Sequence, residues 1–215
     1  MTRDSARPRS PKGDAAEGRG VLLSAARELL SEHGDSRFSL AEVAARAGRN
    51  IALVSYYFGG KEQMLAAILA EDEEVVLGPL RTLAASDLPA EQQLEQHITG
   101  LVDLLAERPY LNTLIHELLR RSGKTIGEDI TNRLIKPIID FQAALLARGL
   151  AEGAFRTVDP FVFHLNLMGG IEMLFSARST VRFGFGLRAD DAKVRERFIR
   201  ETLSLVMDGA RARNT

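Results

Sequence analysis

The chain has 215 residues, of which 45% are hydrophobic and 27% charged, with a net charge of −1; this apolar content supports a packed core and argues against a disordered protein. It contains no cysteine, which excludes disulfides, thiolate metal sites and cysteine nucleophiles and is compatible with a reducing cytosol. No apolar run approaches the roughly 20 residues of a membrane-spanning helix, and the opening MTRDSARPRS lacks a signal-peptide core, so we expect a cytoplasmic protein with no membrane partner.

The first segment, residues 1–18, is rich in Arg, Pro, Ser and Gly and precedes any apolar periodicity. This composition predicts a disordered basic arm. Such an arm can follow DNA phosphates or enter a minor groove, or it can be a solvated tail with no role. The sequence leaves both readings open.

Residues 19–65 contain three helix patterns. The first begins near Arg19 and ends at Gly34, with apolar side chains at helical spacing: Leu22, Ala25, Ala26, Leu29 and Leu30. The second begins at Ser39, which forms a capping box with Glu42, and it turns inward Leu40, Val43, Ala44 and Ala47.

A third, short helix follows the second after a glycine-containing turn. Gly48 ends the second helix, Asn50 can cap the third, and Val54 and Phe58 lie four residues apart on its buried side. Two short helices joined in this way form a helix-turn-helix. The whole segment therefore predicts a three-helix DNA-binding domain over residues 19–65.

The outward face of the third helix and the basic residues around it are candidates for DNA contact. Ile51 and Ala52 can touch a thymine methyl group, while Ser55 and Tyr56 can hydrogen-bond to a base edge or a phosphate. Lys61 follows two glycines at a helix start, where backbone amides and an ammonium can converge on one phosphate. The tyrosines can also be packing residues, and the basic residues solvated charges. The complete set is Arg37, Arg46, Arg49, Asn50, Ile51, Ala52, Ser55, Tyr56, Tyr57 and Lys61.

The rest of the chain predicts further helices and no strand, so the fold class is all-α. A fourth helix starts near Lys61 and should stop before Gly78-Pro79. Prolines at Pro89, Pro109 and Pro160 mark helix starts, and Pro137 predicts a kink inside a helix. The expected helices are 90–107, 109–122, 125–151, 160–179 and 189–211.

The run from Val21 to Leu69, VLLSAARELLSEHGDSRFSLAEVAARAGRNIALVSYYFGGKEQMLAAIL, resembles the N-terminal domain of TetR/AcrR-family transcriptional regulators. It shares the Ala-Ala helix, the Ser-capped second helix, Ala-Gly in the turn, and the aromatic, Phe-Gly and Lys-Glu positions. Two positions depart from the pattern: Arg49 replaces an apolar turn residue, and Ser55 stands where Tyr or Asn is commoner. The resemblance implies a repressor that a small molecule releases from a palindromic operator.

For residues 66–215 the resemblance extends only to the helix layout, and it implies an effector-binding and dimerisation domain. A Met- and Phe-rich region with histidines suits an amphipathic or apolar effector, although each of its residues can equally be plain core. The candidate pocket residues are Tyr110, His116, Phe141, Phe161, His164, Met168 and Met173. Apolar faces on residues 161–175 and 194–206 predict a homodimer.

Two other functions compete with this hypothesis. The stretch Gly184–Ala189 nominally fits a dinucleotide-binding fingerprint, but it lacks a βαβ unit, and the four histidines have no zinc spacing. We therefore expect no catalytic residue, no metal and no cofactor. The second alternative is an all-α protein-interaction module with a purely structural helix-turn-helix. The net charge of −1 argues mildly against DNA binding, because many isolated DNA-binding domains are strongly basic.

Overall fold

The computed structural model describes residues 11–211, with side chains from residue 16 onward. In this range all regular elements are helices, which confirms the all-α prediction, and only Phe155 and Arg211 form an isolated antiparallel bridge. The chain divides into two compact units, Met1–Ile68 and Leu69–Thr215. The sequence places this division three residues earlier. No helix within residues 11–211 is long and apolar enough to cross a membrane.

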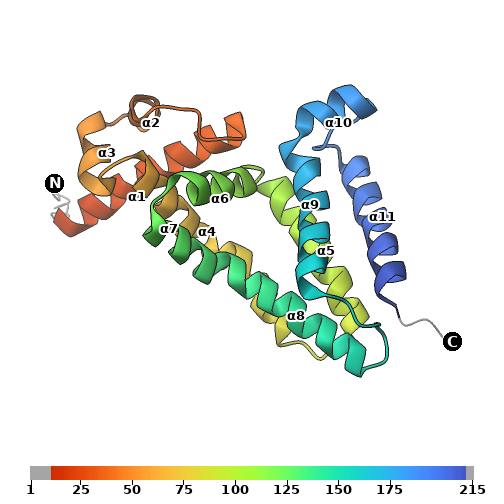
Figure 1. The fold of residues 1–215 in the computed structure, drawn as a ribbon. Helices are drawn as coiled ribbons and strands as arrows, with labels where there is room; N and C mark the ends of the chain where they lie inside the picture. Colours follow the sequence, from red (N-terminus) through yellow and green to blue (C-terminus); the bar gives the residue numbers. More distant parts are fainter. Residues whose placement is uncertain (1–10, 212–215) are drawn as a thin grey trace, which may run out of the picture. The chain divides into compact units, whose positions relative to one another are not determined.

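The first unit consists of α1 (Pro11–His33), α2 (Leu40–Arg46), α3 (Ile51–Phe58) and the start of α4 (Lys61–Ala84) (Figure 1). These helices share one core because each presents its apolar side chains to a single interior. The buried apolar side chains are Leu22, Leu23, Ala25, Ala26, Leu29, Leu30, Phe38, Val43, Ala44, Val54, Phe58, Met64, Leu65 and Ile68.

Helix α1 begins earlier than the sequence predicts. It starts at Pro11, so residues 11–18 are helical and do not belong to an arm, while residues 1–10 lie outside the described residues. Gly18 is buried, and a Cβ atom built on it would lie 3.0 Å from the Tyr57 hydroxyl oxygen. Tertiary packing on α3 therefore supports this N-terminal part of the helix, which has no apolar periodicity of its own.

The second unit continues α4 and adds eight further helical elements among the described residues (Figure 1). Helix α5 is central because it packs against α6, α8, α9 and α11. The elements are α5 (Ala90–Glu107), α6 (Tyr110–Arg121), α7 (Lys124–Ile130), the π turn η1 (Thr131–Ile135), α8 (Lys136–Ala151), α9 (Pro160–Ser176), α10 (Arg178–Phe185) and α11 (Ala192–Ala210).

Two boundaries in this unit correct the sequence prediction. Helix α4 does not stop before Gly78-Pro79 but continues to Ala84. Leu80 and Leu83 still face apolar side chains of α5 in this last part of the helix. The Thr82 hydroxyl also donates to the Gly78 carbonyl at 3.1 Å. The helix expected over 160–179 ends at Ser176, and a separate helix, α10, follows it. Gly186 ends α10 in the left-handed conformation at φ 66°.

Pro137 lies next to a change of helix geometry, at the place where the sequence predicts a kink. Between α7 and α8 the backbone forms the π turn η1, and the Lys136 amide donates to the Thr131 carbonyl five residues earlier. Pro137 thereby falls in the first turn of α8, where a missing N–H leaves no helical bond unmade. The helix path thus runs from Lys124 to Ala151 with one widened turn.

Candidate nucleic-acid interface

The capping box fixes where α2 begins. The Ser39 hydroxyl accepts from the Glu42 amide at 3.2 Å, and the Glu42 carboxylate accepts from the Ser39 amide at 2.7 Å. This backbone donor, together with the Ser39 hydroxyl, holds the pKa of Glu42 below its ordinary value. The helix start is therefore specified by local chemistry, as the sequence predicts.

The turn between α2 and α3 is specified by two further residues. Gly48 has φ 61°, a left-handed conformation that side chains disfavour, and Asn50 caps α3 by accepting from the Ala52 amide at 2.9 Å. Gly59 ends α3 at φ 79°. Helix α3 is thereby limited to eight residues, Ile51–Phe58.

Helix α3 has one buried and one exposed face, as predicted. Val54 is fully buried and Phe58 is 9% exposed, whereas Ile51 is 48% and Tyr56 79% exposed. Ala52 and Ser55 are exposed beside them. The exposed face thus consists of small, hydroxyl-bearing and aromatic side chains, a set suited to reading base edges in a major groove.

The second tyrosine does not share this face. Tyr57 is half-buried, its hydroxyl lies against Gly18 of α1, and its ring makes edge contacts with the rings of Tyr56 and Phe58. Arg19 of α1 lies over the Phe58 ring at 5.2 Å. Tyr57 therefore acts in packing α3 on α1, the second role that the sequence left open for it.

Lys61 is bonded inside the unit. Its ammonium donates to the carbonyl of Phe38 at 2.6 Å and to that of Ser36, and it lies 4.9 Å from the centre of the Phe38 ring. These contacts tie the start of α4 to the loop that precedes α2. The structure thus gives Lys61 a positioning role that sequence reasoning missed, because the residues concerned are more than twenty positions apart.

The three candidate arginines differ in their surroundings. Arg46 pairs with Glu32 and Glu28 of α1, and its hydrogen bond keeps the pKa of Glu32 below the ordinary value. Arg37 pairs with Asp35 at 2.6 Å. Arg49 is exposed in the turn and forms no ion pair within residues 16–211. Arg49 is consequently the one of these three arginines that has no acidic partner in the described part of the chain.

The candidate effector residues of the second unit are spread over several environments. The buried Tyr110 hydroxyl donates to Asp72 at 2.8 Å, and His116 lies 3.3 Å from Glu172. Phe161 and Met173 are 68% and 53% exposed on α9. The remaining members, Phe141, His164 and Met168, are half-buried.

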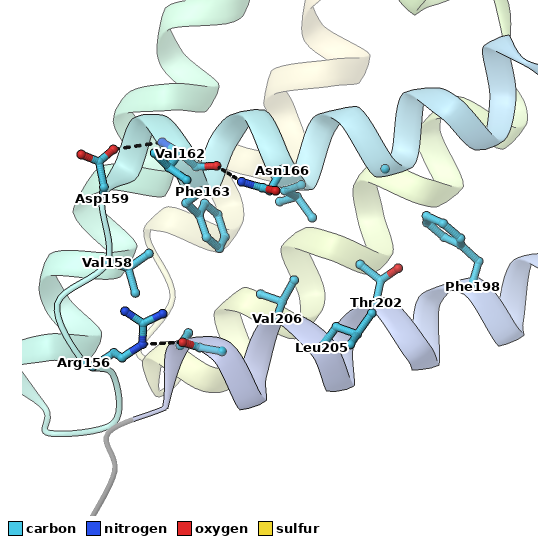
Figure 2. Close-up of a pocket in the computed structure, with 14 residues that line it drawn as sticks. Arg156, Val158, Asp159, Val162, Phe163, Asn166, Phe198, Thr202, Leu205 and Val206 are labelled. Atoms are coloured by element: carbon cyan, nitrogen blue, oxygen red, sulfur yellow. Dashed lines mark hydrogen bonds between the residues drawn. The ribbon is translucent and has the colours of Figure 1, made fainter.

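The concave regions of this unit are lined largely by other residues. A groove of about 690 Å³ lies between α9 and α11, and Figure 2 shows Val162, Asn166, Thr202 and Leu205 on its two sides. A second pocket, of about 340 Å³, is lined by α4, α5 and α8 and contains His97. None of the seven candidate effector residues lines either of these two regions.

A buried polar chain lies next to the second pocket. The Gln142 amide nitrogen is 2.9 Å from His97 Nε2, and the Gln142 carbonyl oxygen is 2.8 Å from His164 Nδ1. Gln142 is fully buried and His97 is 4% exposed. Sequence reasoning missed both residues, although a histidine at a buried position of α5 between Leu94 and Leu101 was a visible signal.

Both units of the chain match models of known protein families. Residues 22–68 match the family described as bacterial regulatory proteins, tetR family, and residues 87–215 match the tetracyclin repressor-like C-terminal domain. The chain belongs to the TetR family. The TetR matches cover both units, and they do not favour the alternative of a protein-interaction module with a purely structural helix-turn-helix.

The individual TetR-like proteins compared with this chain share a quarter or less of its residues. The HTH-type transcriptional regulator RutR of Escherichia coli is 25% identical over 140 residues, which is 65% of each chain, so the match spans just under two thirds of that relative. A TetR/AcrR regulator from Thermobifida fusca is 23% identical with a TM-score of 0.67, covering 91% of this chain and 100% of its own. The regulator FadR of Bacillus subtilis, solved with stearoyl-CoA, is 19% identical with the same TM-score, covering 88% and 98%. At these identities the solved structures show the shared fold.

Proposed function

We propose that this TetR-family chain is a cytoplasmic DNA-binding transcriptional regulator, a homodimeric repressor that a small-molecule effector releases from a palindromic operator. The observation that carries the proposal is the two-faced helix α3, with Val54 and Phe58 buried behind exposed Ile51, Ser55 and Tyr56. A recognition helix needs this division, because the inner face must hold it rigid while the outer face reads bases.

The proposed DNA contacts follow from the exposed face. Ile51 and Ala52 suit a thymine methyl group, and Ser55 and Tyr56 suit a base edge or phosphate. Arg49 and Asn50 directly precede α3, and Arg37 lies in the loop before α2; Arg49 is the proposed phosphate contact. Lys61 and Arg46 are proposed to hold α2 and α3 in position, because both are bonded within the unit.

The proposed dimer uses α9 and α11. Exposed apolar side chains on α9 are Phe161, Val162, Leu165 and Met173, and Leu205 of α11 is 76% exposed and lines the groove of Figure 2. Apolar side chains in this number on two adjacent helices favour burial against a second copy. A two-fold axis through this face would give the two α3 helices a palindromic site.

The effector is proposed to bind in the second unit, in the pocket of about 340 Å³ between α4, α5 and α8. Its walls are mostly aliphatic, which suits an apolar or amphipathic molecule. FadR, which shares the fold, was solved with stearoyl-CoA, so a protein of this fold can bind a molecule with an apolar chain. The proposal assigns no catalytic step to the chain.

DNA binding is tested by selecting operators from random duplexes with the full-length protein and measuring affinity by fluorescence anisotropy at several salt concentrations. We expect one palindromic motif, an affinity at least 10³-fold above random DNA and a steep loss of affinity with salt. Enrichment of no sequence, together with salt-independent binding, would refute the proposal.

The dimer is tested separately by light scattering. Leu205→Glu places a carboxylate in the groove between α9 and α11 and is expected to give monomer. Leu150→Glu is the matched control, because Leu150 is 47% exposed on α8 and does not line that groove; this variant should remain dimeric. Monomeric wild-type protein at micromolar concentration would contradict the interface.

A further inference from the structure

The pocket between α4, α5 and α8 has an unusual balance of polar groups. Six aliphatic side chains from the three helices form most of its wall: Val76, Leu80, Leu83, Leu101, Leu104 and Ile138. Two carboxylates, Asp103 and Glu107, lie on its α5 side. Asp103 pairs with Arg195 of α11 at 3.6 Å, whereas Glu107 forms no ion pair within residues 16–211, and the lining includes no lysine or arginine among the described residues. The pocket therefore disfavours an anionic ligand, which would lose hydration without gaining a cationic partner.

His97 supplies a hydrogen-bond donor to this pocket. An amide nitrogen can only donate, so the Gln142 Nε2 atom at 2.9 Å makes His97 Nε2 an acceptor and leaves the single ring proton on Nδ1. Burial and the nearby His164 lower the pKa of His97 to about 4, so the ring is neutral at pH 7. The donor is thus an uncharged Nδ1–H.

The Nδ1–H group has no partner within residues 16–211 and is still reachable. No hydrogen bond forms at this atom in that range, and it is not among the fully enclosed polar atoms without a partner. His97 is 4% exposed and is one of the residues that line the pocket. A buried donor without a partner is costly, and a ligand oxygen at this point would satisfy it.

The orientation of this donor is fixed from the far side. Gln142 is fully buried, and its oxygen accepts from Nδ1 of His164 on α9 at 2.8 Å. Both ends of the amide are therefore engaged, which holds the His97 tautomer. The same chain of bonds connects the pocket with α9, the helix whose outer side carries the proposed dimer face.

We infer that the effector of this protein is an uncharged or cationic molecule with an apolar body and a hydrogen-bond acceptor, and that the acceptor takes the Nδ1–H of His97 while Gln142 holds the donor in place. This inference rests on the proposed effector function. The inference distinguishes this pocket from one that binds an anionic acyl thioester, because carboxylates lie on the α5 side of the pocket.

The first test needs no ligand. Histidine ring ¹⁵N spectra of the full-length protein at pH 7 should show His97 as the neutral Nδ1–H tautomer, and Gln142→Leu should change that tautomer or mix it. A protonated ring, or the Nε2–H tautomer in the wild-type protein, overturns the inference.

The second test uses three small probes of similar size: acetophenone, which is uncharged and accepts hydrogen bonds; benzoate, which is anionic; and ethylbenzene, which lacks an acceptor. Acetophenone should shift the His97 Nδ1 signal and bind about five- to ten-fold more tightly than ethylbenzene, and benzoate should bind least. Equal binding of acetophenone and ethylbenzene, strongest binding of benzoate, or no acetophenone shift at His97 each overturns the inference.

Two variants localise the effect. His97→Leu should remove the preference for acetophenone over ethylbenzene, whereas His116→Leu, an exposed control that does not line the pocket, should keep it. Glu107→Gln should improve benzoate binding a few-fold. These measurements do not involve DNA, so they can fail while operator binding by the ligand-free protein, which tests the proposed function, succeeds.

Discussion

Replacing Lys61 by methionine separates two roles that this residue could have in DNA binding. In the structure its ammonium donates to the carbonyls of Ser36 and Phe38 and lies over the Phe38 ring. Hydrogen bonds from charged donors contribute about 1.5–3 kcal/mol each, and a cation–π contact at a partly exposed site about 0.5–1 kcal/mol. The low ends of these ranges total about 3.5 kcal/mol. Because Lys61 is only half-buried, solvent screening reduces this contribution, and we expect a total loss of about 2–3 kcal/mol.

The loss should be local and measurable in two ways. Amide hydrogen exchange over residues 36–44 should accelerate roughly 30- to 150-fold, which is the expected free-energy change converted into an equilibrium constant. The slope of the logarithm of operator affinity against the logarithm of salt concentration should stay unchanged, because a residue that touches no phosphate releases no counterion.

Arg49→Ala is the matched control for this prediction. Arg49 is exposed and forms no ion pair in the described part of the chain, so its removal should leave exchange unchanged and reduce the salt slope by about 0.9. If Lys61→Met instead lowers the salt slope by that amount with normal exchange, Lys61 contacts a phosphate and the positioning role is wrong.

Three further changes test other parts of the structure. Tyr56→Ala removes a side chain that is 79% exposed; it should leave the melting temperature within a degree or two and relax operator preference in anisotropy titrations against mismatched sites. Gly149→Ala puts a Cβ atom 2.0 Å from the buried Phe155 ring and should destabilise the protein by about 2–3 kcal/mol in urea unfolding. The control is Gly20→Ala, whose Cβ atom would have no atom within 4 Å and which should be neutral or stabilising. Equal effects of the two substitutions would disprove this packing. The pKa of His97 is about 4 in the folded protein and 6.5 for a free side chain, so the unfolded chain takes up the proton first as the pH falls. The free energy of unfolding should therefore decrease by about 2 kcal/mol between pH 7 and pH 5. This pH-dependent loss should vanish in His97→Leu.

The predictions that held were those with a short-range cause. The Ser39–Glu42 capping box, the Asn50 cap and the burial of Val54 and Phe58 each depend on residues within a few positions of one another. Capping and helical periodicity act over this range. The recognition helix can therefore be predicted from local sequence alone.

The features that the sequence did not reveal depend on distant contacts. Lys61 bonds to carbonyls more than twenty residues away, and Gln142 joins side chains 45 and 22 residues distant. Helix α10 was missed because it is short and two of its aromatic side chains, Phe183 and Phe185, face solvent. Local pattern carries no information about which polar groups meet across a helical domain.

The π turn η1 lets the second unit carry one residue more than an uninterrupted α-helix would, without changing which faces of α7 and α8 meet the interior. An α-helix rotates by about 100° per residue, so returning Thr131–Ile135 to α geometry with all of its residues retained would turn α8 by about that angle relative to α7. Gln142 would then leave His97 and His164. Removing one residue together with the return to α geometry would instead keep Gln142 in place, so TetR-like chains with a one-residue gap at this turn can still share the buried polar chain.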